Sequence, residues 1–122
     1  MKVLLGIGGS EDSVRALEET VERAVAVGDD LTVAVLDNPD SERSAEAVES
    51  LVRERLSEAG LDAEVRRIEG DPGSRVVDIA EREGFDQVVL GGGQRSPMGK
   101  IRVGSIAEFV LLNSRVSVKL VR

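Results

Sequence analysis

Residues 87–93 read QVVLGGG, a short apolar run that ends in three consecutive glycines. Two more apolar runs, Lys2–Ile7 and Leu31–Leu36, come earlier in the chain, and Lys2–Ile7 also ends among glycines. Apolar runs of this length predict strands that are buried on both faces of a sheet. We therefore expect Gln87–Leu90 to form a central strand beside Lys2–Ile7.

Segments with helical periodicity separate these runs. Each predicted helix has a recognisable start: Ser10, Ser41, the pair Asp71-Pro72 and, approximately, Gly104. Serine and aspartate accept hydrogen bonds from the first turn of a helix, and proline suits its first position. Further strands are expected at Leu61–Ile68 and Val116–Val121.

The predicted order is strand then helix four times, followed by a last strand. This alternation is typical of a doubly wound α/β fold, with a five-stranded parallel sheet and helices on both faces. A chain of 122 residues is the usual size of one domain, so residues 1–122 are expected to form a single domain.

Glycines cluster at two places. Gly6, Gly8 and Gly9 surround the end of the first strand, and residues 91–104 hold five more after the fourth strand. A ligand crevice in such a sheet lies at the carboxyl ends of the strands, where the winding reverses. Two glycine-rich turns at one crevice make strands one and four neighbours, which predicts the order 3-2-1-4-5. The alternative is that these glycines only allow tight turns and close packing.

A group of cations accompanies the second cluster. Residues 87–107 contain Arg95, Lys100 and Arg102 but no Asp or Glu. Together with the helix start near Gly104, they predict a phosphate cradle, because the free N–H groups of a helix N-terminus favour anions. The alternative is that these cations are solvated or paired with acids. The spacings of the Walker and Rossmann glycine motifs are absent, which argues against those two modes of nucleotide binding.

Composition narrows the classes of function. The chain has no cysteine or histidine, so disulfides, thiolate metal sites and catalysis by either side chain are excluded. We expect no catalytic residues and no enzyme activity. The formal net charge of −7 argues against binding to nucleic acid.

No apolar run is long enough for a membrane span, and the first residues do not resemble a signal peptide. The expected location is the cytoplasm. Of the 16 basic residues only Lys2, Lys100 and Lys119 are lysines, and a surface rich in acids and poor in lysine suits high internal salt. A halophilic source is therefore a hypothesis.

Four stretches resemble the universal stress protein family. They are Gly9-Ser10, Glu69–Pro72, Phe85–Gly93 with Arg95-Ser96, and Gly104–Glu108. The resemblance runs the whole length of the chain and implies the family's adenine nucleotide alpha hydrolase-like fold. Some members of this family bind ATP or AMP, so it also implies a regulatory stress-response module with a nucleotide site, and a divalent metal only together with the nucleotide.

The family pattern implies contacts to the phosphates from Gly91, Gly104 and Ser105, and contacts to adenine and ribose from Val35, Leu90 and Ile106. The whole implied site is Ile7, Gly8, Val35, Leu90, Gly91, Gly92, Gly93, Gly104, Ser105 and Ile106. Two positions depart from the nucleotide-binding members: Gly8 stands in place of an aspartate, and Gln94 in place of the second glycine. They favour an alternative function, a dimeric interaction or scaffold protein without nucleotide. The family often dimerises through its last strand, here Val116–Val121, and protein partners beyond a second copy are unknown.

Overall fold

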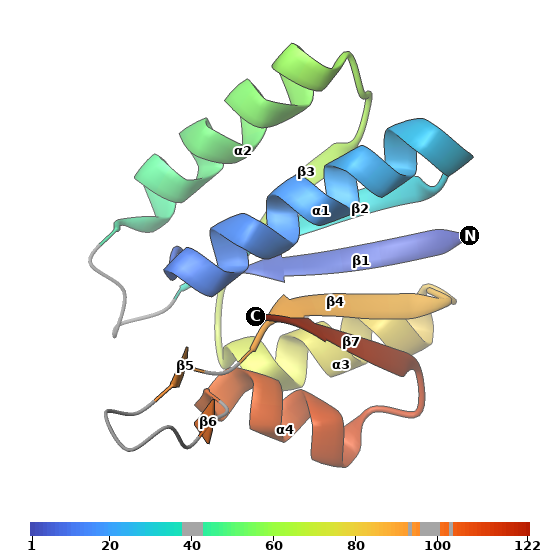
Figure 1. Ribbon diagram of the computed structural model, residues 1–122. Coiled ribbons are helices and arrows are strands. Elements are labelled where there is room, and N and C mark those ends of the chain that lie inside the picture. The colour runs from blue at the N-terminus through green and yellow to red at the C-terminus, as the bar shows by residue number, and fades with distance from the viewer. Residues whose placement is uncertain (38–42, 93, 96–100, 103) are drawn as a thin grey trace.

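Five parallel strands form the central sheet of the computed structural model, which describes residues 1–37, 43–92, 94–95, 101–102 and 104–122 (Figure 1). The strands are β1 (Lys2–Ile7), β2 (Asp30–Leu36), β3 (Glu64–Ile68), β4 (Gln87–Gly91) and β7 (Ser117–Val121). Their order is β3-β2-β1-β4-β7. This confirms the predicted order, with β7 as the fifth strand.

The register aligns the ends of the central strands. Ile7 of β1 lies opposite Val35 of β2, and Gly6 lies opposite Leu90 of β4. The carboxyl ends of β1, β2 and β4 therefore meet at one side of the sheet. We call this side the carboxyl rim, and the helices begin there, as Figure 1 shows.

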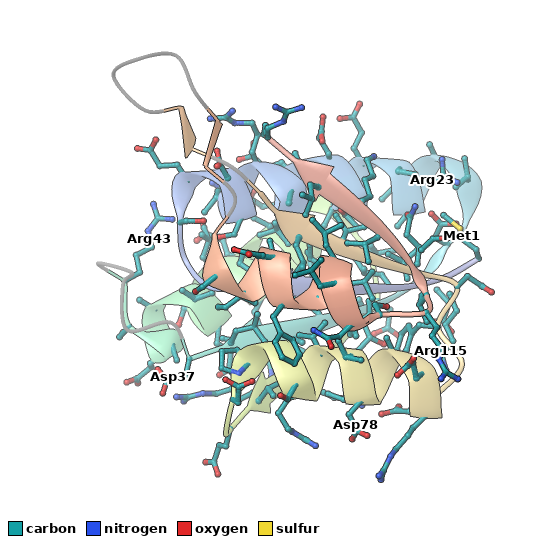
Figure 2. All side chains as sticks on the ribbon, turned by 90° about the horizontal axis from the view of Figure 1, so that it is seen from below. Met1, Arg23, Asp37, Arg43, Asp78 and Arg115 are labelled. Carbon is teal, nitrogen blue, oxygen red and sulfur yellow. The ribbon has the colours of Figure 1, made fainter. Side chains whose placement is uncertain are left out.

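Two helices cover each face of the sheet. Helices α1 (Glu11–Val27) and α2 (Ala45–Ala59) lie on one face, and α3 (Pro72–Arg82) and α4 (Ser105–Asn113) lie on the other. Figures 1 and 2 show α3 and α4 side by side on their shared face. The sheet is therefore the middle of three layers, as expected for a doubly wound fold.

Alternation along β1 divides the core in two. Val3, Leu5 and Ile7 pack toward α1 and α2, whereas Leu4 packs toward α3 and α4. All of these side chains are buried, which explains why the strand reads as a continuous apolar run.

The helix starts follow the predicted capping chemistry with one correction. Ser10 caps α1 by accepting from Ser13 N–H, and Asp71 caps α3 by accepting from Ser74 N–H. The residue that caps α2 is Ser44, whose hydroxyl accepts from Ala47 N–H. The predicted cap, Ser41, lies outside the described residues and three positions before this cap.

Some strand bounds differ from the sequence prediction. β3 begins at Glu64 rather than Leu61, although Leu61 still packs against the α1–α2 side of the core. β7 begins at Ser117, one residue after the predicted start. The sequence also gave no indication of a small antiparallel hairpin, formed by β5 (Gln94–Arg95) and β6 (Ile101–Arg102). Among the helices that the structure describes, none is long and apolar enough to cross a membrane.

Candidate functional site

The carboxyl rim brings together sequence segments that are far apart in the chain. β1 ends there at Ile7, followed by Gly8, and the neighbouring strand β4 ends there at Gly91. Helix α4 begins at the same side with Ser105 (Figure 1). The described glycines of the two clusters thus lie on the same rim of adjacent strands, as the sequence predicts.

Three of the predicted contact residues have side chains in the core. Ile7 and Val35 are buried between the sheet and the α1–α2 layer, at 0% and 1% exposure. Leu90 is equally buried on the α3–α4 side. In this conformation a ligand at the rim can contact the backbone of these residues, but their side chains pack in the core.

Gly91 and Gly92 are required by close packing. A Cβ added to Gly91 would lie 2.3 Å from the backbone nitrogen of Ser13 in the first turn of α1. A Cβ on Gly92 would lie 2.9 Å from side-chain atoms of Leu120 on β7. The N–H of Gly92 also donates a hydrogen bond to the carbonyl of Val121 on the same strand. For these two positions the structure therefore supports the packing alternative of the sequence analysis.

Gly104 has the opposite environment. It occupies the N-cap of α4 with φ −64° and ψ 155°, nearly the conformation of the caps Ser10 and Ser44, but it has no side chain to accept a hydrogen bond. A Cβ placed on it would meet no atom of the described residues within 4 Å. Within the described residues, the first N–H groups of α4 thus have no side-chain cap and no neighbour close to Gly104, which is the arrangement that favours an anion.

The two residues after Gly104 complete the start of α4. Ser105 is exposed and Ile106 is half-buried against the α3–α4 side of the core. Ser105 can therefore offer both its backbone N–H and its hydroxyl at the rim. Among the four helices that the structure describes, α1, α2 and α3 have side-chain caps and α4 does not.

The predicted cations are only partly described. Arg95 and Arg102 lie in the β5–β6 hairpin, where Gln94 pairs with Arg102 and Arg95 pairs with Ile101. Gly93 and Lys100 lie outside the described residues. The structure thus places two of the three predicted cations on one hairpin between β4 and α4.

The carboxylates at the rim lie at the ends of secondary structure elements. The hydrogen bond from Ser74 N–H holds the pKa of Asp71 below its usual value, so this cap stays ionised. Asp37 is exposed directly after β2. In the part of the chain that the structure describes, no three acidic side chains are grouped to hold a metal ion.

A model of the universal stress protein family matches residues 1–122. The chain belongs to the universal stress protein family. The match covers the whole sequence, including both glycine clusters, so it agrees with the resemblance drawn from the motifs.

Known relatives resemble this universal stress protein in sequence and in fold. Universal stress protein MJ0531 of Methanocaldococcus jannaschii is 30% identical over 71 residues, which is 58% of this chain and 42% of that relative. A universal stress protein of Archaeoglobus fulgidus superposes with a TM-score of 0.82 at 22% identity, covering 100% of this chain and 98% of the other. A universal stress protein in complex with cAMP superposes with a TM-score of 0.77 at 26% identity, covering 100% and 96%.

Proposed function

We propose that this universal stress protein is a regulatory module that holds an adenine nucleotide, ATP or AMP, at the carboxyl rim. The observation that carries the proposal is the start of α4, where no described residue caps the first N–H groups or lies within 4 Å of a Cβ built on Gly104. A phosphate there would accept hydrogen bonds from these groups and from Ser105. The cAMP complex of a relative with the same fold supports an adenine nucleotide as the ligand class.

Gly91 and Gly92 have an indirect role in this proposal. Their missing side chains let β4 end close to α1 and β7, which shapes the rim next to α4. A divalent metal would enter only with the phosphates. We further propose that the module is not an enzyme and acts in the cytoplasm. The absence of histidine and cysteine from the sequence supports a role without acid–base or thiol catalysis.

The test is ligand-induced thermal stabilisation. Millimolar ATP or AMP, at matched ionic strength, is expected to raise the melting temperature, because a ligand that binds only the folded state stabilises it. Gly104→Val is expected to remove this rise by filling the space beside the first turn of α4. The control is Leu112→Ala near the other end of α4, where the side chain is 77% exposed, and it should keep the full response. An unchanged melting temperature of the wild type with both nucleotides would disprove nucleotide binding.

A dimeric scaffold without nucleotide is the second candidate, favoured by the packing role of Gly91 and Gly92. Mass spectrometry of small molecules released from freshly purified protein separates the two functions. A stoichiometric adenine nucleotide supports the first, and its absence together with no thermal response supports the second.

The two outer strands of the sheet differ in a way that supports dimerisation through β7. β3 has three charged residues in five, Glu64, Arg66 and Arg67, and charged edges resist pairing with another chain. β7 has one charged residue, Lys119, between the half-buried Val118 and Leu120. Pairing of β7 with its copy would extend the sheet and cover these apolar side chains.

Light scattering tests the dimer at micromolar concentration. The wild type is expected to show the mass of two chains, and Val118→Lys the mass of one, because it places a charge beside the pairing edge. The matched control is Val65→Lys on β3, also half-buried but on the opposite outer strand, which should stay dimeric. Circular dichroism verifies that both variants are folded, and a monomeric wild type would refute the dimer.

A further inference from the structure

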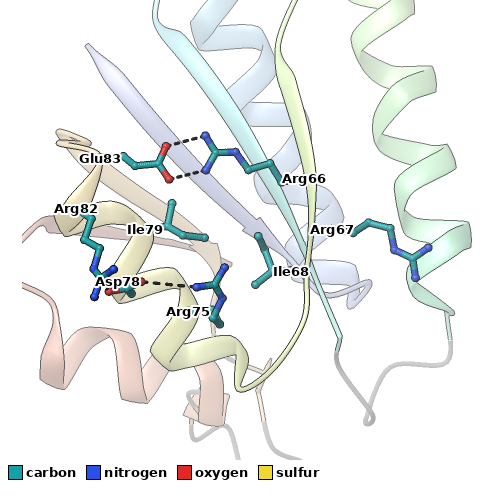
Figure 3. Close-up of a pocket in the computed structure, with 8 residues that line it drawn as sticks. All are labelled: Arg66, Arg67, Ile68, Arg75, Asp78, Ile79, Arg82 and Glu83. Atoms are coloured by element: carbon teal, nitrogen blue, oxygen red, sulfur yellow. Dashed lines mark hydrogen bonds and ion pairs between the residues drawn. The ribbon is translucent and has the colours of Figure 1, made fainter.

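A pocket of about 600 Å³ lies between β3 and α3 (Figure 3). Besides two isoleucines, its lining is charged: Arg66, Arg67, Arg75, Arg82, Asp78 and Glu83. Its residues come from the outer strand β3 and from α3 with its C-cap. On the α3 side of the pocket two arginines, Arg75 and Arg82, face one carboxylate, Asp78, so this side carries a local positive charge on a chain of net charge −7.

Arg66 forms a fixed wall of this pocket. Its guanidinium donates to both carboxylate oxygens of Glu83, at 2.6 and 2.7 Å, and to those of Glu64, at 2.7 and 3.1 Å. With these donors engaged by two carboxylates, Arg66 is not available to a ligand. Arg67 is not available either, because Figure 3 shows its side chain pointing away from α3.

Arg75 and Arg82 have donors to spare. They share a single carboxylate: Arg82 Nε lies 2.7 Å from Asp78 Oδ1, whereas Arg75 comes only within 3.7 Å of Asp78 Oδ2. The longer distance is beyond hydrogen-bonding range, so the Arg75 guanidinium donates no hydrogen bond within the described part of the chain. Figure 3 shows Arg75, Asp78 and Arg82 together on the α3 side of the pocket.

We propose that this pocket binds a small anion with more than one phosphate charge, held by Arg75 and Arg82. The planar guanidinium fork matches the oxygens of a phosphate, and two forks suit an ion with several oxygens. Asp78 lies 2.7 Å from Nε of Arg82 and 3.7 Å from Arg75, so both guanidinium groups keep terminal N–H donors for the oxygens of one ligand. The apolar part of the lining is Ile68 and Ile79, which are buried at 6% and 5% exposure.

Titration with inorganic pyrophosphate at low ionic strength tests this site, because the probe has no base or sugar. Calorimetry is expected to show saturable binding to the wild type and a loss of at least about tenfold in affinity for Arg75→Gln/Arg82→Gln. Both side chains are largely exposed, at 47% and 79%, so the variant should remain folded. The matched control is Arg15→Gln/Arg53→Gln, which makes the same charge change at exposed positions of α1 and α2.

The outcomes separate this pocket from the carboxyl rim. The proposal requires that the control and Gly104→Val keep wild-type affinity for pyrophosphate, and that backbone NMR shifts center on residues 66–68 and 75–83. An equal loss in the control would show general attraction to positive charge and overturn the site. So would a loss on Gly104→Val alone, which would assign the anion to α4, or a wild type that binds no pyrophosphate.

Discussion

At the scale of single residues, the glycines after β4 divide into two kinds. At Gly91 and Gly92, neighbouring segments of the chain lie so close that a Cβ would clash with them. At Gly104, by contrast, a Cβ would meet no atom of the described residues within 4 Å, and α4 begins there without a side-chain cap. The sequence shows all three as equivalent members of a glycine-rich stretch, because the atoms that crowd Gly91 come from residues 12 and 13, far away in the sequence.

Gly91→Ala is expected to destabilise the fold by about 1–3 kcal/mol, the usual cost of overfilling a packed site. The added methyl group would meet the backbone of Ser13, which cannot rotate away as a side chain can. Urea denaturation of the protein without ligand measures the effect. A variant as stable as the wild type would show that α1 moves freely away from β4.

Gly104→Ser is expected to have the opposite effect on stability. The N-cap conformation already matches that of Ser10 and Ser44, so a serine hydroxyl can cap α4 and add a few tenths of a kcal/mol. The same hydroxyl would accept a hydrogen bond from the N–H groups that we propose bind phosphate. We therefore expect higher stability without nucleotide and a smaller thermal shift with ATP, and an unchanged shift would place the phosphates elsewhere.

At the scale of elements, the sequence predicts the interior well and the periphery less well. β1, β2 and β4 are continuous apolar runs, and the caps Ser10 and Asp71 are predicted from their local sequence, whereas for α2 the prediction names Ser41 and the cap is Ser44. β3 is an outer strand whose start depends on pairing with β2, so its local pattern extended the prediction to Leu61. The β5–β6 hairpin has two pairs of residues and no apolar alternation, which leaves no local signal.

One feature of the sequence is related to the pocket between β3 and α3. Arg66-Arg67 interrupts the alternation of the third strand, but its partner Glu83 lies 17 residues away at the end of α3. A pattern of neighbouring residues cannot indicate that contact. The site is therefore a product of the fold, in which Arg66 joins an outer strand to a helix.

This junction predicts a pH dependence. The hydrogen bonds from Arg66 hold the pKa of Glu83 and of Glu64 below the usual 4.5. A carboxyl group with a lowered pKa in the folded state contributes stability above its unfolded pKa and loses it as the pH falls through the folded value. The stability difference between the wild type and Arg66→Met should be full near neutral pH and shrink below 4.5.

Chemical denaturation at a series of pH values measures this difference. Arg53→Met is the control, because Arg53 lies 3.9 Å from its partner Glu49 and is 60% exposed, so it should show little dependence on pH. A difference for Arg66→Met that stays constant down to the acid limit would show that Arg66 acts through its aliphatic stem and not through its ion pairs.

At the scale of the whole molecule, the net charge of −7 sets the response to salt. Like charges repel across the folded surface, and salt shortens the reach of this repulsion from about 10 Å at 0.1 M to about 3 Å at 1 M. The ion pairs of Arg66 are also screened, but their atoms are in direct contact and lose less. We therefore expect the melting temperature to rise between 0.1 M and 1 M KCl.

A variant with fewer acids shows whether repulsion is the cause. Glu19, Glu22 and Glu54 are exposed and have no ion pair in the described part of the chain. Replacing all three with glutamine removes three negative charges without breaking a contact, so the rise in melting temperature with KCl should become smaller. If the variant kept the full rise, salt would be acting on apolar burial. A melting temperature that falls as KCl rises would contradict the hypothesis of a high-salt source. In that case the loss of attraction within ion pairs would outweigh the relief of repulsion among the acidic side chains.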